Sequence, residues 1–154
     1  MTPGLADLPC ACATARRVSR LLTQLYDSHL RPHGLESTQF ALLSLLAVAG
    51  PTSQAAIGQR FGYDKTTLSR NLKVMREHGW IAVAEGETAR ERPCVLTTEG
   101  RARLTAARPA WRRAQAALRA SMGEGDWEAM WTAFRTITGA GQAARRGARA
   151  PRRR

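Results

Sequence analysis

Hydrophobic positions between residues 10 and 50 recur at helical spacing and predict two helices. The first covers about 10–31, and its apolar stripe faces away from its charged residues; the stripe consists of Val18, Leu21, Leu22, Leu25, Tyr26 and Leu30. Pro32 and Gly34 end this helix. The second covers about 37–48 and is apolar nearly all round, so we expect it to lie centrally in the core.

Two shorter helices follow, with a glycine at position 62 between them. Thr52 or Ser53 can cap the first and Asp64 the second, whose buried side would consist of Leu68, Leu72 and Met75. Two short helices joined by a glycine-containing turn are typical of a helix-turn-helix. In that motif the second helix lies in the major groove of DNA and presents its N-terminal turns to the bases.

The runs WIAVA and CVLT, at 80–84 and 94–97, are strand-like and flank a polar, charged segment that holds Gly86 and Pro93. This pattern predicts a β-hairpin with a long basic tip, and a hairpin directly after a helix-turn-helix is a wing. Thr97 or Thr98 then caps a long helix.

The long helix has an apolar seam with 3-4 spacing, which favours packing against a partner helix; the seam consists of Leu104, Ala107, Trp111, Ala114 and Leu118. Pro109 predicts a kink, and Gly123 and Gly125 end the helix. A last helix places Trp127, Met130, Trp131, Phe134 and Ile137 on one face. From about Gly139 the chain lacks apolar anchors, and we expect a disordered basic tail over 139–154.

The charge balance favours a nucleic-acid partner. Lys and Arg number 24 against 12 Asp and Glu, a net charge of +12. Six arginines after Gly139 account for half of that excess. A compositional bias is the alternative, because Lys65 and Lys73 are the only lysines and alanine is abundant, as a GC-rich genome would produce.

Composition also limits the compartment. No run of 18 apolar residues occurs, and no charged segment precedes an apolar stretch at the N-terminus, so we expect neither a membrane span nor a secretory signal. Three cysteines are an odd number, which argues against a disulfide framework and favours a cytoplasmic protein with reduced thiols.

Three stretches together resemble a known family. They are LYDSHLRPHGLESTQFALLSLL at 25–46, SQAAIGQRFGYDKTTLSRNLKVMREHGWI at 53–81, and the segment from TARERP to LTTEGRA at 88–102. With these motifs in this order, residues 10–138 resemble the MarR family of bacterial winged-helix regulators. The family's wing usually carries Asp-x-Arg, whereas Thr88-Ala89-Arg90 keeps the arginine and lacks the acid.

The resemblance implies a mainly α fold with a small β-wing, in which N- and C-terminal dimerisation helices flank a winged helix-turn-helix domain. The expected organisation is an N-terminal arm at 1–9, dimerisation and ligand-cleft helices at 10–50, the DNA-binding region at 51–98, C-terminal dimerisation helices at 99–138 and the tail at 139–154. It implies a homodimer held by the first and the last two helices; the alternative is that the seam packs only within one subunit.

The candidate DNA-binding residues lie on the second helix of the motif, at the start of the first, and on the wing. Arg70 can bind guanine through two hydrogen bonds, and Lys73 suits a phosphate. Arginines at the wing tip suit a narrow minor groove. The full set is Ser53, Gln54, Thr66, Thr67, Ser69, Arg70, Lys73, Arg90 and Arg92. The alternative is that these residues are solvated surface.

Family members bind small molecules in a cleft between the dimerising helices and the DNA-binding region. By that resemblance, the candidate cleft residues are Arg16, Arg20, Tyr26, His29, His33 and Trp111. Arginines beside aromatic rings would suit a small anionic aromatic ligand. His29 and His33 are four residues apart, which could chelate a metal, but Pro32 lies between them, and we interpret them as ordinary polar residues.

Cys10 and Cys12 precede Arg16 and Arg17 at the start of the first helix, a setting that favours a reactive thiolate. Cys12 also lies 14 residues before Tyr26, which resembles the reactive cysteine of the hydroperoxide-sensing branch of the family. Three interpretations stay open: packing residues, a redox switch, or a soft-metal site. Cys94, on a wing strand, is predicted to be a packing residue.

These features predict a DNA-binding transcriptional regulator, a repressor that acts as a homodimer on a pseudo-palindromic operator and is released by a small ligand or by thiol oxidation. The alternative is a winged-helix module for protein–protein assembly without sequence-specific DNA binding. The sequence contains no Gly-rich phosphate loop after a strand, no H-E-x-x-H and no credible Ser/His/Asp set, so we expect no catalytic residues, no cofactor and no metal.

Overall fold

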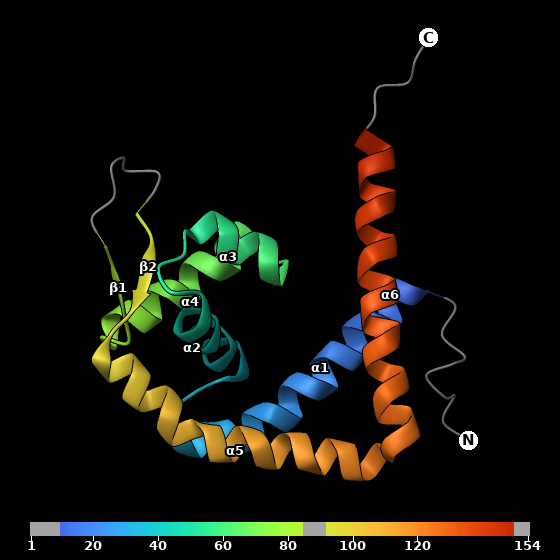
Figure 1. Ribbon diagram of the computed structural model, residues 1–154, viewed down its shortest axis with the longest axis horizontal. Helices are drawn as coiled ribbons and strands as arrows, with labels where there is room; N and C mark the ends of the chain where they lie inside the picture. The colour runs from blue at the N-terminus through green and yellow to red at the C-terminus, as the bar shows by residue number, and fades with distance from the viewer. Residues whose placement is uncertain (1–9, 85–91, 150–154) are drawn as a thin grey trace. The chain divides into compact units, whose positions relative to one another are not determined.

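The computed structural model describes residues 10–84 and 92–149 (Figure 1), and the chain divides into two compact units, 1–114 and 115–154. The elements are α1 (Ala11–Leu30), a 3-10 turn η2 (Arg31–His33), α2 (Ser37–Ala49), α3 (Gln54–Phe61), α4 (Lys65–Glu77), β1 (Ile81–Val83), β2 (Cys94–Leu96), α5 (Thr98–Met122) and α6 (Glu124–Arg149). The predicted mainly α class with a small antiparallel wing is confirmed. Across the described ranges, no helix is both long and apolar enough to span a membrane.

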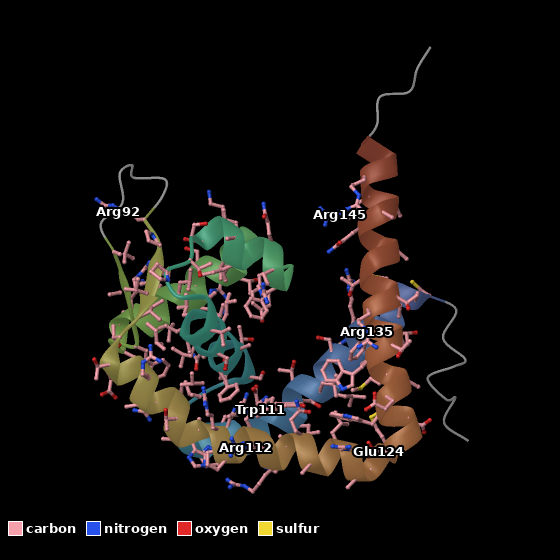
Figure 2. All side chains as sticks on the ribbon, in the orientation of Figure 1. Arg92, Trp111, Arg112, Glu124, Arg135 and Arg145 are labelled. Carbon is pink, nitrogen blue, oxygen red and sulfur yellow. The ribbon has the colours of Figure 1, made fainter. Side chains whose placement is uncertain are left out.

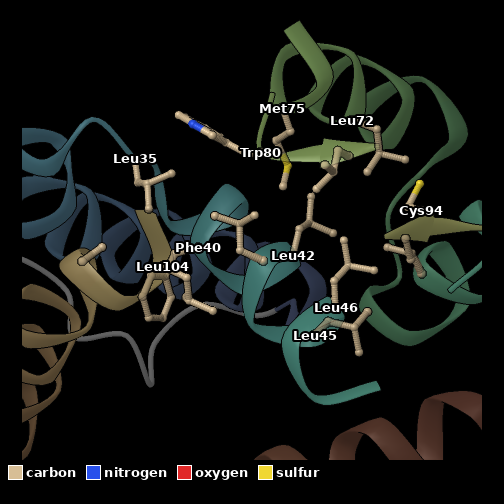
Figure 3. Packing of buried hydrophobic residues seen from close by; sticks show 14 of the residues in the cluster. Leu35, Phe40, Leu42, Leu45, Leu46, Leu72, Met75, Trp80, Cys94 and Leu104 are labelled. Atoms are coloured by element: carbon tan, nitrogen blue, oxygen red, sulfur yellow. The ribbon is translucent and has the colours of Figure 1, made fainter. Parts of the chain in front are cut away.

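Helix α2 lies in the centre of the first unit, as its nearly uniform apolar sequence predicts, and it contacts α1, α4 and β2. Its start is fixed by Asp27 of α1, whose Oδ1 accepts the Ser37 amide N–H at 2.7 Å. Figure 3 shows Leu42, Leu45 and Leu46 of α2 in one buried group with Leu72 and Met75 of α4. The buried cluster includes Leu30, Leu35, Phe40, Leu42, Leu43, Leu46, Ile57, Leu68, Leu72, Met75, Trp80, Ile81, Cys94 and Leu104.

Helix α5 is joined to the wing by its first turn. The Thr97 hydroxyl accepts the Gly100 amide N–H at 3.0 Å and donates to the Gly79 carbonyl at 2.6 Å, so Thr97 is the cap. On the predicted seam, Leu104, Ala107 and Ala114 are buried within the first unit. Ala110 is buried as well, and Trp111 stacks on Phe40 at 5.7 Å between ring centroids.

The second unit contains the end of α5 and the whole of α6. Gly123 separates the two helices with a positive φ of 81°, whereas Gly125 lies inside α6. The prediction of a disordered tail from residue 139 is wrong as far as Arg149, because α6 continues through that segment. Alanine, arginine and glutamine are strong helix formers, and no proline occurs between Gly139 and Pro151, so the glycines alone do not end the helix.

Candidate nucleic-acid interface

Helix α4 separates its apolar and polar residues onto opposite sides, as predicted. Leu68, Leu72 and Met75 are buried beneath it. The side chains of Thr66, Ser69, Arg70 and Lys73 are exposed on the other side. Lys73 forms an exposed ion pair with Glu77 at 3.8 Å, which in this setting contributes at most about 1 kcal/mol. This face therefore presents hydroxyls and two cations to solvent.

The start of α4 is held by Asp64. Its carboxylate accepts the Thr67 amide N–H at 2.9 Å and the Thr67 hydroxyl at 2.6 Å. Both hydrogen bonds hold the pKa of Asp64 below its usual value, and the bond from the hydroxyl has the larger effect. The Thr67 hydroxyl proton is therefore engaged within the helix, and only the oxygen's acceptor capacity is left for a ligand. Thr67, one of the candidate DNA-binding residues, would have to release Asp64 before its hydroxyl could donate to a phosphate.

The start of α3 is tied to the wing by a backbone bridge. The Thr52 amide N–H donates to the Cys94 carbonyl at 3.0 Å, and the Cys94 amide N–H donates to the Thr52 carbonyl at 2.9 Å. Ser53 caps α3, and its hydroxyl accepts the Ala56 amide N–H at 3.2 Å. That amide is consequently occupied, whereas Ser53 and Gln54 themselves are half-exposed at the helix N-terminus. Sequence reasoning identified the cap but not the bridge.

The wing is a short antiparallel pair in which Ile81 faces Leu96 and Val83 faces Cys94. Arg92 is exposed just before β2, as Figure 2 shows. Arg90, like the other tip residues of the range 85–91, lies outside the described residues.

Two exposed cations beside the turn of the motif were not singled out from the sequence. Lys65 is the first residue of α4 and Arg60 lies in the last turn of α3. Both are exposed. Their positions could have identified them from the sequence. Lys65 begins the helix whose N-terminal turns approach DNA in this motif, and Arg60 lies on the other side of the turn that precedes that helix.

The predicted cleft residues do not form one group in the structure. Arg16 and Arg20 line an open hollow along α1, with Cys12, Ala15, Ser19 and Thr23 as its other lining residues. Trp111 instead stacks on Phe40, and the His33 carbonyl accepts a hydrogen bond from Arg103 at 3.2 Å. Tyr26 packs against the core, where burial raises the pKa of its phenol.

The cysteines differ in their environments. Cys10 is the N-terminal cap residue of α1 with an extended backbone, and Cys12 lies in the first turn; both are exposed. Their exposure contradicts the interpretation of packing residues within this chain. Cys94 is buried, as predicted, and burial raises the pKa of its thiol. No group of three or more potential metal-ligating side chains occurs in residues 10–84 and 92–149.

Comparison of the sequence with known proteins identifies a family model and a related regulator. The MarR family model matches residues 33–91. The HTH-type transcriptional regulator YwoH of Bacillus subtilis is 35% identical over 81 residues, which cover 53% of this chain and 59% of that protein, so the match spans about three fifths of the relative.

Solved structures extend the similarity to most of the chain. The M. tuberculosis transcriptional regulator MosR in complex with DNA is 40% identical, with a TM-score of 0.78 over 88% of this chain and 98% of that one. The Streptomyces coelicolor regulator PcaV, in complex with its natural ligand, shares the fold at 20% identity, with a TM-score of 0.75 over 92% of this chain and 99% of that one. The matched family model, the likeness to MosR and the winged helix-turn-helix geometry lead to one conclusion: the chain belongs to the MarR family of winged helix-turn-helix transcriptional regulators.

Proposed function

We propose that the protein is a repressor that binds a pseudo-palindromic DNA site as a homodimer. The observation that carries this proposal is the exposed polar face of α4, where Arg70 projects beside Thr66 and Ser69 above a fully apolar buried side. Two-fold symmetry would place the half-sites about one helical turn apart, on the order of 34 Å. The complex of MosR with DNA, at 40% identity, supports a DNA partner.

Arg70 is the proposed base-reading residue. A guanidinium can donate two parallel hydrogen bonds to the O6 and N7 atoms of guanine, which discriminates against other bases by about 1–3 kcal/mol. Thr66 and Ser69 offer hydroxyls that suit several base edges or a phosphate. Lys73 suits a phosphate, and it would exchange its weak pairing with Glu77 for a polyanion.

Phosphate contacts would position the motif on the duplex. Ser53 and Gln54 lie at the N-terminus of α3, whose partial positive charge would attract a backbone phosphate. Lys65 and Arg60 add two exposed cations at the turn. Arg92, and by expectation Arg90, would approach the minor groove from the wing.

A homodimer is supported by the apolar face of α6. Trp127 and Trp131 pack edge to face at 5.8 Å, and Phe134 extends the row at 6.0 Å. Trp131 is 40% exposed, Phe134 38% and Ile137 66%. A row of large exposed apolar side chains on one helix face is typical of a surface that associates.

Release from DNA is proposed to follow a small ligand or thiol oxidation. For oxidation, the Cys12 thiolate would attack the O–O bond of a peroxide, giving a sulfenic acid and releasing an alcohol or water. The Cys10 thiol would then displace water to form a disulfide. For a ligand, Arg16 and Arg20 in the α1 hollow would pair with an anionic group.

The alternative is a protein–protein assembly module whose arginines reflect composition alone. A titration with a random duplex and with DNA that flanks the protein's own gene, at several salt concentrations, separates the two. A regulator loses affinity steeply with salt and prefers the flanking DNA, and footprinting then gives the operator. An assembly module shows neither behaviour.

A further inference from the structure

The C-terminal part of α6 is a cationic rod. Glu128 is the last acidic residue of the chain, and four of the seven arginines that follow it lie on α6: Arg135, Arg145, Arg146 and Arg149. The helix continues to Arg149, and Arg145 and Arg146 are exposed on it. Figure 2 shows Arg145 projecting sideways from the helix.

Packing does not account for this segment. Beyond Ile137 the helix contains no large apolar side chain, so about 12 residues, or roughly 18 Å at 1.5 Å per residue, have nothing to bury. Gly139, Gly141 and Gly147 each cost about 1 kcal/mol relative to alanine within a helix. Adjacent arginines also repel one another. Such a helix gains stability when an anion neutralises it.

Double-stranded DNA is the occupant that these observations favour. Double-stranded DNA is a regular array of negative charges about 1.7 Å apart along its axis. The segment after Ile137 has neither the large apolar side chains nor the acidic residues that a protein partner would use. Arginine guanidinium groups bind phosphate oxygens through paired hydrogen bonds.

We propose that Arg145 and Arg146 form a second DNA contact, separate from the helix-turn-helix, that binds backbone phosphates without regard to sequence. This inference rests on the proposed function, because it assumes a protein that meets DNA. The contact would raise affinity for every duplex alike and would leave the choice of operator to α4.

The test uses the full-length protein with Arg145→Gln and Arg146→Gln together, since glutamine keeps helix propensity and removes both charges. Arg112→Gln with Arg113→Gln is the matched control, because these arginines are adjacent and exposed on α5 and give the same charge change. Affinity for a random-sequence duplex is measured across a salt series. Each lost phosphate contact lowers the salt slope by about 0.9, so losing the two contacts of even one protomer makes the deficit about tenfold larger at 50 mM than at 200 mM salt, and loss from both protomers of a dimer makes it larger still.

The proposal is overturned if the double variant keeps the salt slope of the control. It is also overturned if the variant changes the oligomeric state instead, which would assign these arginines to contacts between copies. Preference for the flanking DNA over the random duplex is a separate readout. If wild type lacks that preference, the proposed operator binding fails, while the slope comparison still decides the role of Arg145 and Arg146.

Discussion

Asp64 and Thr67 close the first turn of α4 through two hydrogen bonds, one from the amide at 2.9 Å and one from the hydroxyl at 2.6 Å. This pair fixes the direction in which the proposed DNA-reading turn leaves the preceding loop. Both bonds favour the charged carboxylate, which is why the pKa of Asp64 is lowered.

That lowered pKa gives a pH dependence with a definite sign. A carboxyl group whose folded-state pKa is below its unfolded value stabilises the fold above the unfolded value, about 4, and loses this effect as the pH falls through the folded pKa. We therefore expect wild type to unfold at a higher temperature than Asp64→Ala at pH 7, and the gap to shrink below about pH 4. Thermal unfolding across pH measures it. Asp64→Asn, which retains a capping oxygen but cannot titrate, should show a gap to Asp64→Ala that does not depend on pH.

Arg70 and Lys73 should give different losses of DNA binding. Arg70→Ala is expected to weaken specific binding by about 1–3 kcal/mol and to relax preference at one base pair. Lys73→Ala should weaken binding to all sequences alike and reduce the salt slope. Competition between operator variants measures preference, and a salt titration measures the slope. Unchanged preference in Arg70→Ala would show that α4 is not placed as proposed.

The sequence was sufficient to predict features that depend on local residue type and spacing, such as helix caps and the buried side of a helix. Asp64 caps α4 as predicted, and of the two cap candidates at the starts of α3 and of α5 the structure has Ser53 and Thr97. The buried side of α4 follows directly from helical spacing. Long-range pairing was not visible. Nothing in the sequence indicates that Thr52 bridges Cys94, because a backbone ladder depends on register and not on side-chain type.

The end of α6 shows a different limit. Three glycines from Gly139 onward suggested disorder, but α6 continues through them, among alanines and arginines that favour a helix. The cleft was transferred from the family by position and stays a prediction. Trp111 stacks on Phe40, a long-range contact that helical spacing does not indicate.

Gly100 is required by close packing. A Cβ atom there would lie 2.0 Å from the Trp80 carbonyl oxygen, a backbone atom that cannot turn away. We expect Gly100→Ala to destabilise the protein by at least about 1–3 kcal/mol, the range for overpacking. Gly139→Ala is the matched control, because its Cβ meets nothing within 4 Å and alanine favours the helix. Denaturant unfolding should lower the midpoint of Gly100→Ala and leave that of Gly139→Ala at or slightly above the wild-type value.

A truncation after Gly139 tests whether the end of the chain is helical or disordered. The described residues beyond it that have an assigned exposure are all exposed, so the melting temperature and the oligomeric state should hardly change. Circular dichroism should nevertheless lose the helical signal of about ten residues, and DNA affinity should fall mainly at low salt. A monomeric or unstable product would show that the segment packs.

The last prediction concerns Cys12, which is exposed in the first turn of α1 within the same hollow as Arg16 and Arg20. Cys10 lies outside the helix in extended conformation, although its carbonyl accepts the Thr14 amide at 3.0 Å, so a Cys10–Cys12 disulfide requires the first turn to open. If peroxide oxidises Cys12 and this opening follows, the start of α1 moves and DNA is released. DNA affinity with and without peroxide should therefore fall for wild type but not for Cys12→Ser, while Cys94→Ser should behave as wild type because Cys94 is buried. Retention of DNA by all three proteins under peroxide would exclude the thiol switch and leave a small ligand as the signal.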